Sequence, residues 1–252
     1  MKVMLYIYVF IFCACIGSFA NVLIYRLPKG ENFIIGRSYC PKCHHTLKMS
    51  EMIPIFSWIL LKGRCRWCRQ KISIAYFIIE VISVGIGYFC FSYHGFGSGF
   101  FISFFICELL LVVSVIDLIT MTIPDSLNII LAFLAIIAYC LHPDISLIER
   151  LIGMSVISLL MIVLNLFVMD SFGGGDIKLM IAAGFLLGWQ KTLVAGVLGI
   201  MSASVYASYL LVKKKANRKT HIPFGPFLSL GIMISFFYGW QFIDMYLMLV
   251  KV

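Results

Sequence analysis

Two aspartates stand in surroundings that single them out for acid–base chemistry. Asp117 lies at the end of an apolar run, and Asp176 directly follows the glycines 173–175. Two carboxylates held close together share a proton, so one can act as a base on water while the other acts as an acid on a carbonyl. That is the chemistry of aspartic proteases. From residue types and spacing alone, two other interpretations stay open: aspartates that cap or pack helices, and a cation or proton pathway.

Glycine and proline shape the backbone beside these aspartates. Three consecutive glycines allow conformations closed to other residues, so the loop before Asp176 could admit an extended peptide beside the carboxylate. Pro124 breaks the helix that ends near Asp117 and keeps the following loop near the membrane interface. Asp125 comes next in the chain and is the nearest rival of Asp117, because both residues flank this loop.

Four cysteines form a second group with chemistry of its own. They occur as two Cys-x-x-Cys pairs, Cys40 with Cys43 and Cys65 with Cys68. Two such pairs separated by about 20 residues predict a tetrahedral four-thiolate zinc site. A thiol–disulfide redox pair and structural disulfides are the alternatives. No βαβ pattern surrounds the cysteines, and a cytoplasmic location would keep the thiols reduced.

The elements that must position these residues are membrane helices. Of the 252 residues, 62% are hydrophobic and only 12% are charged. About a quarter of the residues in a soluble domain are charged, so this composition excludes a water-soluble core. A helix needs about 20 apolar residues to cross a bilayer. The predicted runs are 3–25, 74–94, 100–118, 126–142, 148–169, 177–191, 193–212 and 226–250.

The fold class is therefore an all-α polytopic membrane protein of about eight transmembrane helices. A small cytoplasmic zinc-knuckle segment is inserted after the first helix. The first run is a retained helix and not a signal peptide, because the dense basic segment follows it instead of preceding it.

Basic residues are clustered and predict the orientation of the chain. The formal net charge is +9, and ten of the 20 Lys and Arg residues lie within 26–71. The positive-inside rule puts the N-terminus outside and residues 26–73 in the cytoplasm. Neither basic cluster has a nucleic-acid fold signature, so we expect no nucleic-acid partner. After seven helices the cytoplasmic side also receives the second cluster: Lys213, Lys214, Lys215, Arg218 and Lys219.

Six stretches of the sequence, in order, resemble the type IV prepilin peptidase family, the leader peptidases of type IV pili and type II secretion. The Gly-Gly-Gly-Asp stretch also resembles the wider Gly-x-Gly-Asp intramembrane aspartyl proteases. The six stretches are residues 17–28, the two Cys-x-x-Cys pairs, Glu51-Met-Ile-Pro54 with Ser57-Trp58, Asp117 with Ile123-Pro124-Asp125, Gly173-Gly-Gly-Asp176-Ile-Lys178, and Pro223-Phe-Gly-Pro226.

The resemblance implies a multi-pass enzyme of the bacterial inner membrane, with Asp117 and Asp176 as its catalytic residues. Its substrates would be prepilins and pseudopilins, cut after the Gly that ends a short basic leader, at the cytoplasmic face. Many family members also N-methylate the new N-terminus with S-adenosylmethionine, and the cysteine region of the family is linked to that activity. The sequence has no Rossmann-type glycine loop. The methyl donor thus follows from the resemblance alone, and no donor-binding residue is indicated.

Three domains are expected on this basis. They are a first transmembrane helix at 1–25, a cytoplasmic Cys-x-x-Cys domain at 26–73 and a membrane aspartyl peptidase domain at 74–252. The expected partners are the pilin substrates and the lipid bilayer. Two other functions are kept beside the peptidase: a membrane transporter of ions or small solutes that uses the same aspartates, and a zinc-knuckle scaffold without activity.

Overall fold

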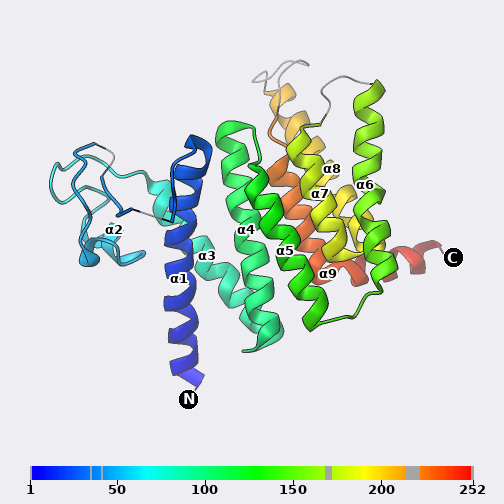
Figure 1. Cartoon of the computed structure of the whole chain (residues 1–252), viewed down its shortest axis with the longest axis horizontal. Coiled ribbons are helices and arrows are strands. Elements are labelled where there is room, and N and C mark those ends of the chain that lie inside the picture. Colours follow the sequence, from blue (N-terminus) through cyan, green and yellow to red (C-terminus); the bar gives the residue numbers. More distant parts are fainter. Residues whose placement is uncertain (1, 35, 41, 168–171, 214–221, 251–252) are drawn as a thin grey trace. The chain divides into compact units, whose positions relative to one another are not determined.

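The computed structural model of the chain is built from helices joined by short loops (Figure 1). Its described residues contain no strand, only two isolated β-bridges, so the predicted all-helical fold is confirmed. Apart from Lys213, the second basic cluster lies outside the described residues. Those residues are 2–34, 36–40, 42–167, 172–213 and 222–250.

The chain divides into two compact units, Met1–Glu108 and Leu109–Val252. Helix α4 belongs in part to each. The first unit contains α1 (Lys2–Arg26), the short helices η1 (Leu27–Lys29), η2 (Met49–Glu51) and α2 (Phe56–Leu60), α3 (Ile74–His94) and the start of α4 (Ser98–Thr120). The second contains the end of α4, α5 (Asp125–Leu141), α6 (Leu147–Phe167), α7 (Gly174–Leu187), α8 (Trp189–Val212) and α9 (Gly225–Val250).

Close helix packing in the first unit depends on small residues. Helices α1 and α3 pack together, and a Cβ at Gly87 of α3 would collide with the side chain of Cys13 on α1. Small residues at such crossings let backbones approach closely, which is how membrane helices associate. Glu108 of α4 accepts a 2.7 Å hydrogen bond from the Ser83 hydroxyl of α3, which joins the two helices.

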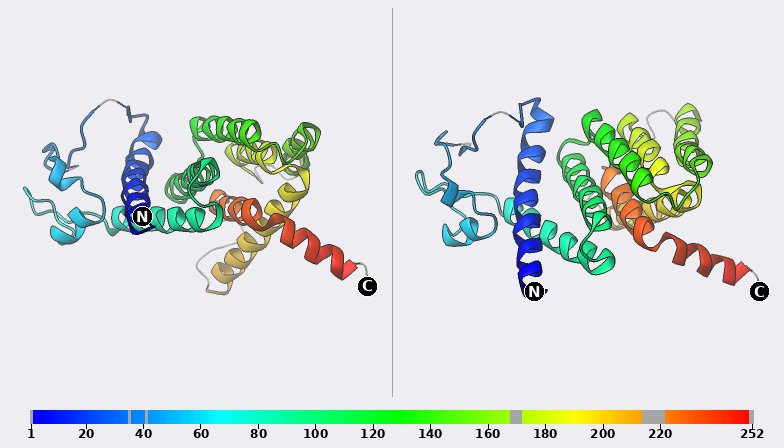
Figure 2. Two further views of the ribbon diagram at one scale, coloured as in Figure 1. Left: turned by 90° about the horizontal axis from the view of Figure 1, so that it is seen from below. Right: turned by 60° about the horizontal axis from the view of Figure 1, so that its bottom comes forward.

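Small residues also allow close helix packing in the second unit. Helix α7 packs on α5 and α6, and α8 packs on α6 and α9. Gly153 and Gly184 bring α6 and α7 into backbone contact, and a Cβ on either would collide with the other chain segment. The buried Arg150 of α6 donates to the carbonyls of Phe185 and Leu186, both at 3.0 Å, and so satisfies the last turn of α7. The final part of α9 extends away from the other helices of this unit (Figure 2).

Six helices of the described chain are long and apolar enough to cross a membrane: α1, α3, α4, α6, α8 and α9. Helices α5 and α7 are shorter, with 17 and 14 residues. Helix α7 ends at Leu187 instead of the predicted residue 191, because Gly188 adopts φ +74°, a left-handed conformation that favours glycine. The chain is a multi-pass membrane protein, and the count of eight crossings stays a prediction.

Candidate active site and metal centre

Asp117 lies in the last turn of α4, with 4% of its surface exposed. Its Oδ2 accepts a 2.8 Å hydrogen bond from the backbone N–H of Gly225, the first residue of α9. Unpaired N–H groups and the helix dipole make such an N-terminus favourable for negative charge. A Cβ at residue 225 would lie 2.8 Å from Asp117 Oδ2. The close approach of α9 to the carboxylate therefore requires glycine.

Asp176, like Asp117, lies beside the start of a helix. It is in the first turn of α7, is 9% exposed, and its backbone N–H donates to the Gly173 carbonyl at 3.1 Å. The Oδ1 atom of Asp176 is buried and has no hydrogen-bond partner among the described residues. A buried polar atom is almost always paired in a folded protein, so an unpaired one indicates a place for a substrate group or water.

The structure brings Asp117 and Asp176 together in the second unit. The two are near enough for the charge of Asp117 to act on Asp176. Two buried carboxylates in one site cannot both ionise freely, so they are suited to holding a shared proton. Helices α9 and α7 direct their N-termini at this site, one toward each carboxylate.

The glycine loop before Asp176 lies against the loop that follows α4. A Cβ at Gly175 would stand 2.9 Å from the Cβ of Ile123 and 3.2 Å from its carbonyl oxygen. The Asn128 side chain of α5 donates to the Gly175 carbonyl at 3.3 Å. Gly174, by contrast, has no atom within 4 Å of the position of a Cβ. One glycine is thus needed for packing, and its neighbour faces open space.

Asp125 differs from the buried pair. It begins α5, its side chain is 62% exposed, and Lys178 of α7 contacts both its oxygens at 2.8 Å. Sequence reasoning named Asp125 as a rival of Asp117 but did not identify this ion pair. The pair ties the start of α5 to the first turns of α7, beside the glycine loop.

Two aromatic rings join the loops that lead into α7 and α9. Phe172 and Phe224 have ring centroids 5.3 Å apart, and each precedes the glycine at which its loop turns into the helix start. Asn165 of α6 fixes Phe172 by bonding both its N–H and its carbonyl, at 2.8 and 2.9 Å. Sequence reasoning missed these contacts and the Gly225 N–H. Only the Pro-Phe-Gly-Pro stretch of the sequence gave a signal near them.

The four predicted cysteine ligands come together in the first unit. The Sγ atoms of Cys40, Cys43, Cys65 and Cys68 all lie within 4.8 Å of one another, a group that could hold a metal ion. Cys40 Sγ and Cys68 Sγ are 3.9 Å apart. A tetrahedral zinc site with Zn–S bonds of about 2.3 Å separates its sulfurs by roughly 3.8 Å. The Cys40–Cys68 distance is close to that value.

The two cysteine turns have the same backbone pattern. Each is closed by an isolated β-bridge, Tyr39 with Thr46 and Arg64 with Lys71. In each, the residue after the second cysteine has a left-handed φ, +55° at His44 and +57° at Arg69. The turn hydrogen bonds are Cys40 N–H to His45 O at 3.0 Å, His44 N–H to Cys40 O at 2.9 Å, Cys65 N–H to Gln70 O at 2.9 Å and Arg69 N–H to Cys65 O at 3.0 Å.

The first turn also favours a thiolate. Burial raises the pKa of Cys40, but hydrogen bonds from the backbone N–H groups of Cys43 and Lys42 outweigh burial and lower this pKa to about 7. A hydrogen bond from the His45 backbone lowers the pKa of Cys43, while burial and the neighbouring thiols together raise it to about 11. The Cys40 thiolate thus forms readily, and its negative charge disfavours ionisation of the neighbouring Cys43 thiol. A bound cation would offset this repulsion.

Two family models match the chain. Residues 11–94 match the Bacterial Peptidase A24 N-terminal domain, and residues 104–208 match the Type IV leader peptidase family. The first match contains the four cysteines, and the second contains both buried aspartates. The chain belongs to the type IV leader peptidase family and is an enzyme of that class. The predicted family and its peptidase character are confirmed.

Individual relatives are similar in sequence over almost the whole chain. The prepilin leader peptidase/N-methyltransferase of Bacillus subtilis is 30% identical, with 94% of this chain and 96% of the relative covered. The protein of the same name from Vibrio cholerae is 30% identical, with 92% of this chain and 97% of the relative covered. The one from Aeromonas salmonicida is 29% identical, with 92% of this chain and 90% of the relative covered. No solved structure matches the chain.

Proposed function

We propose that this chain is an intramembrane aspartyl endopeptidase that cuts type IV prepilins or pseudopilins. Cleavage follows the Gly that ends a short basic leader, at the cytoplasmic membrane face. The observation that carries the proposal is the pair of buried carboxylates, Asp117 and Asp176, gathered at two helix N-termini. The names of the relatives support the substrate class.

The surroundings of the two carboxylates suggest different roles. The Gly225 N–H stabilises negative charge on Asp117, so Asp117 is the base that takes a proton from the attacking water. Asp176 has an unpaired oxygen and is the acid that gives its proton to the scissile carbonyl. Water oxygen bonds to the carbonyl carbon to form a tetrahedral intermediate with two hydroxyls. The C–N bond then breaks as the proton held by Asp117 passes to the leaving amine, and one hydroxyl returns a proton to Asp176.

Asp125 has a positioning role in this proposal. Its ion pair with Lys178 holds the start of α5 against the first turns of α7, and both side chains are largely exposed. The glycine loop runs between these elements and contacts Ile123. Asp125 thereby helps to place the loop that precedes Asp176, without itself contacting the reacting atoms.

The orientation of the chain follows from its charge. Ten Lys and Arg residues within 26–71 favour the cytoplasmic side of a bacterial inner membrane, with the N-terminus outside. The site of Asp117 and Asp176 then opens near the cytoplasmic face. A basic leader would arrive from that side.

Zinc is the metal that the four cysteines fit best. Four thiolates at tetrahedral spacing are typical of a closed structural zinc site with no open position for catalysis. The described residues of the segment between α1 and α3 form only short helices and two isolated bridges, so a bound ion would supply much of its order.

A second activity, N-methylation of the new pilin N-terminus, is part of the proposal and follows the names of the relatives. S-adenosylmethionine would supply the methyl group, with an N–C bond formed and a C–S bond broken as the amine proton passes to water. The first unit has a cavity with unpaired buried polar atoms that suits such a donor.

Cleavage of a prepilin by purified protein in detergent tests the peptidase. Asp117→Asn and Asp176→Asn should each lower kcat by about 1,000-fold, within the range for loss of an acid–base group. Asp144→Asn, the same change at an exposed loop residue, is the matched control and should keep full activity. Full cleavage by either site variant contradicts the proposal. Ion flux that depends on the aspartates, with no cleavage, would identify a transporter instead.

A further inference from the structure

The cysteine segment, defined here as residues 27–73, contains an apolar stretch between its two pairs of cysteines. Residues 52–61 read Met-Ile-Pro-Ile-Phe-Ser-Trp-Ile-Leu-Leu and include no charged residue, and charged residues stand directly before and after them. An apolar run of this length is too short to span a bilayer and is typical of a buried core helix or of a re-entrant or interfacial segment. The burial of its side chains distinguishes these alternatives.

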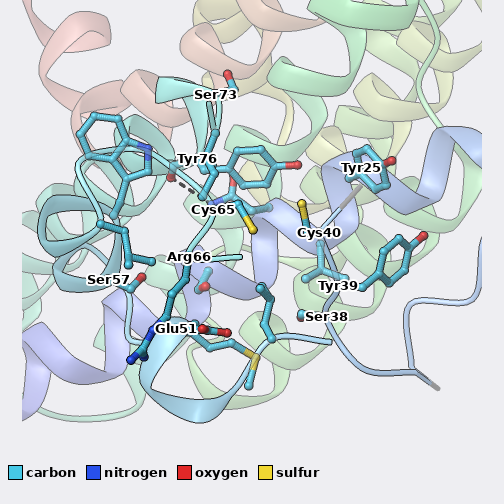
Figure 3. Close-up of a pocket in the computed structure, with 18 of the residues that line it drawn as sticks. Tyr25, Ser38, Tyr39, Cys40, Glu51, Ser57, Cys65, Arg66, Ser73 and Tyr76 are labelled. Carbon is cyan, nitrogen blue, oxygen red and sulfur yellow. Dashed lines mark hydrogen bonds between the residues drawn. The ribbon is translucent and has the colours of Figure 1, made fainter. Parts of the chain in front are cut away.

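One face of the stretch is turned toward the protein. It lines a cavity of about 460 Å³ in the first unit, between α1, α3 and the cysteine segment. Figure 3 shows Ser57 at this cavity, on the same wall as Glu51. The residues of the stretch that line the cavity are Met52, Ser57, Trp58 and Leu61.

The other face is apolar and exposed. Its large side chains do not line the cavity, and their exposed fractions run from 49% at Ile53 to 78% at Leu60. Exposed apolar side chains gathered in this way exclude a buried core helix and mark a surface that another apolar phase covers. This outer face consists of Ile53, Phe56, Ile59 and Leu60.

Two contacts place the outer face at the depth of the membrane-spanning helices. The Ile55 N–H donates to Glu80 Oε2 at 2.7 Å, and Glu80 lies about 9 Å along α3 from the start of that helix. The rings of Phe56 and Phe10 have centroids 6.1 Å apart, and Phe10 lies about 24 Å along α1 from Arg26. The hydrocarbon core of a bilayer is about 30 Å thick, so the Phe56 ring reaches the depth of the acyl chains.

The backbone of the turn is suited to that depth. Polar backbone groups in the hydrocarbon core must be bonded within the protein. Pro54 has no N–H, and the Ile55 N–H has its bond to α3. The Phe56 N–H donates to the Pro54 carbonyl at 2.6 Å, and the Ser57 N–H donates to the Ile53 carbonyl at 3.0 Å. The first of these bonds closes a γ-turn, which reverses the chain as a re-entrant segment requires.

Basic residues flank the outer face. Lys48, Lys62 and Arg64 are exposed and form no ion pair with any described residue. Long basic side chains beside a membrane-inserted segment extend to the headgroups, where anionic lipids attract them. An apolar face with basic residues at its ends is therefore complementary to an anionic bilayer. A water-soluble partner would not reach a face that lies beside Phe10.

We propose that residues 52–61 form a re-entrant element whose outer face contacts lipid acyl chains, while Lys48, Lys62 and Arg64 bind anionic headgroups. In the proposed orientation of the chain, the lipids belong to the cytoplasmic leaflet. The cysteine segment is thereby anchored in the membrane beside α1 and α3. This role is separate from the proposed catalysis, because none of these residues belongs to the unit that holds Asp117 and Asp176.

An environment-sensitive fluorescent amino acid in place of Leu60 tests the proposal in the full-length protein. The protein would be reconstituted in vesicles of phosphatidylethanolamine and phosphatidylglycerol, without pilin. We expect blue-shifted emission, a loss of fluorescence to nitroxides on the lipid acyl chains and little loss to aqueous iodide.

The same fluorescent amino acid in place of Ile34 is the matched control. Ile34 belongs to the cysteine segment and is 79% exposed, but it lies outside the apolar stretch, and its N–H donates to the Asn32 side chain at 2.8 Å. Iodide should quench the fluorescence at this position more strongly than the acyl-chain nitroxides do.

Ile59→Asp in the protein labelled at position 60 is a second, independent variant. A charge at acyl-chain depth is costly, so the label should move toward water, with a red shift and greater loss to iodide. Ser50→Asp adds the same charge at an exposed polar residue of the segment and should leave the emission unchanged.

Three results would overturn the proposal. They are iodide quenching at position 60 as strong as at position 34, emission that Ile59→Asp leaves unchanged, and nitroxide quenching that an excess of prepilin removes. The last would assign the outer face to the substrate instead of to lipid. Depth is read without cleavage, so failure of the peptidase proposal would appear separately.

Discussion

The aspartate pair and the cysteine cluster are two groups of ionisable side chains that the chain orders in different ways. Asp117 and Asp176 are held by packed helices, and the helix starts at Gly225 and Gly174 supply the favourable electrostatics. The cysteines are held by two tight turns in a segment with little regular structure. Packing fixes the first group, whereas we propose that a bound ion orders the second.

This difference has a consequence for what each site can do. A site fixed by packing can keep a buried oxygen unpaired, as at Asp176, and so have it ready for a substrate. A site fixed by an ion uses all its ligands on that ion and is closed to chemistry. From this comparison we propose a structural role for the cysteines and a catalytic role for the aspartates.

Removal of the metal should have the largest effect and should separate the two sites. We expect about one zinc per chain in reduced, purified protein. Chelation should abolish amide-exchange protection in the cysteine segment, because metal binding and folding are coupled there. Protection in α5 to α9 should be unchanged. If protein without zinc keeps amide-exchange protection in the segment between α1 and α3, the segment does not depend on a bound ion and the proposed difference between the two sites is wrong.

Gly225→Ala tests whether packing controls the aspartate pair. The added Cβ would lie 2.8 Å from Asp117 Oδ2, so the start of α9 or the carboxylate must move. We expect kcat for prepilin cleavage to fall by about 100-fold, the cost of a displacement near 1 Å in an active site. Gly97→Ala adds the same methyl group where no atom lies within 4 Å and should leave kcat unchanged.

The glycine loop offers a sharper test from two adjacent residues. Gly175→Ala places a Cβ 2.9 Å from Ile123, whereas Gly174→Ala meets nothing within 4 Å. We expect a loss of about tenfold in kcat for the first, because the loop before Asp176 shifts by a few tenths of an ångström. The second should have wild-type activity. Equal losses in both variants would mean that loop flexibility, not packing, determines the position of Asp176.

Lys178→Met should have the smallest effect. The ion pair with Asp125 is more than half exposed on both sides, and such pairs contribute about 0–1 kcal/mol. The change in kcat should accordingly stay below about fivefold. A loss as large as that of Asp176→Asn would contradict a positioning role for this ion pair, and steady-state cleavage kinetics distinguish the two outcomes.

The sequence predicted the cysteine cluster more completely than the aspartate pair. Spacing alone named Cys40, Cys43, Cys65 and Cys68, because a knuckle is a local turn whose geometry follows from two intervening residues. Asp117 and Asp176 are far apart in the chain, and their proximity depends on how α4, α7 and α9 pack. Spacing therefore left helix capping and ion transport open beside catalysis, and the family motifs were needed to choose.

The helices themselves were predictable because apolar runs are long and their breaks contain Gly, Pro and charged residues. The end of α7 was missed because the chain turns at Gly188, which lies inside an apolar run and gives no polar signal. The cavity wall was missed for another reason. Glu80 is a single acid in an apolar run of the sequence, and only the folded chain brings it to the Ile55 N–H and to the cavity of the first unit.

The central claim is that Asp117 and Asp176 act as one catalytic unit, and a double-mutant cycle tests it most directly. The kcat for prepilin cleavage would be measured for Asp117→Asn, Asp176→Asn and the double variant, with zinc content and unfolding midpoint as checks on folding. Residues that act as a unit are strongly non-additive, so the double variant should be no slower than the slower single variant. Losses that multiply, or a single variant with wild-type kcat, would contradict the claim.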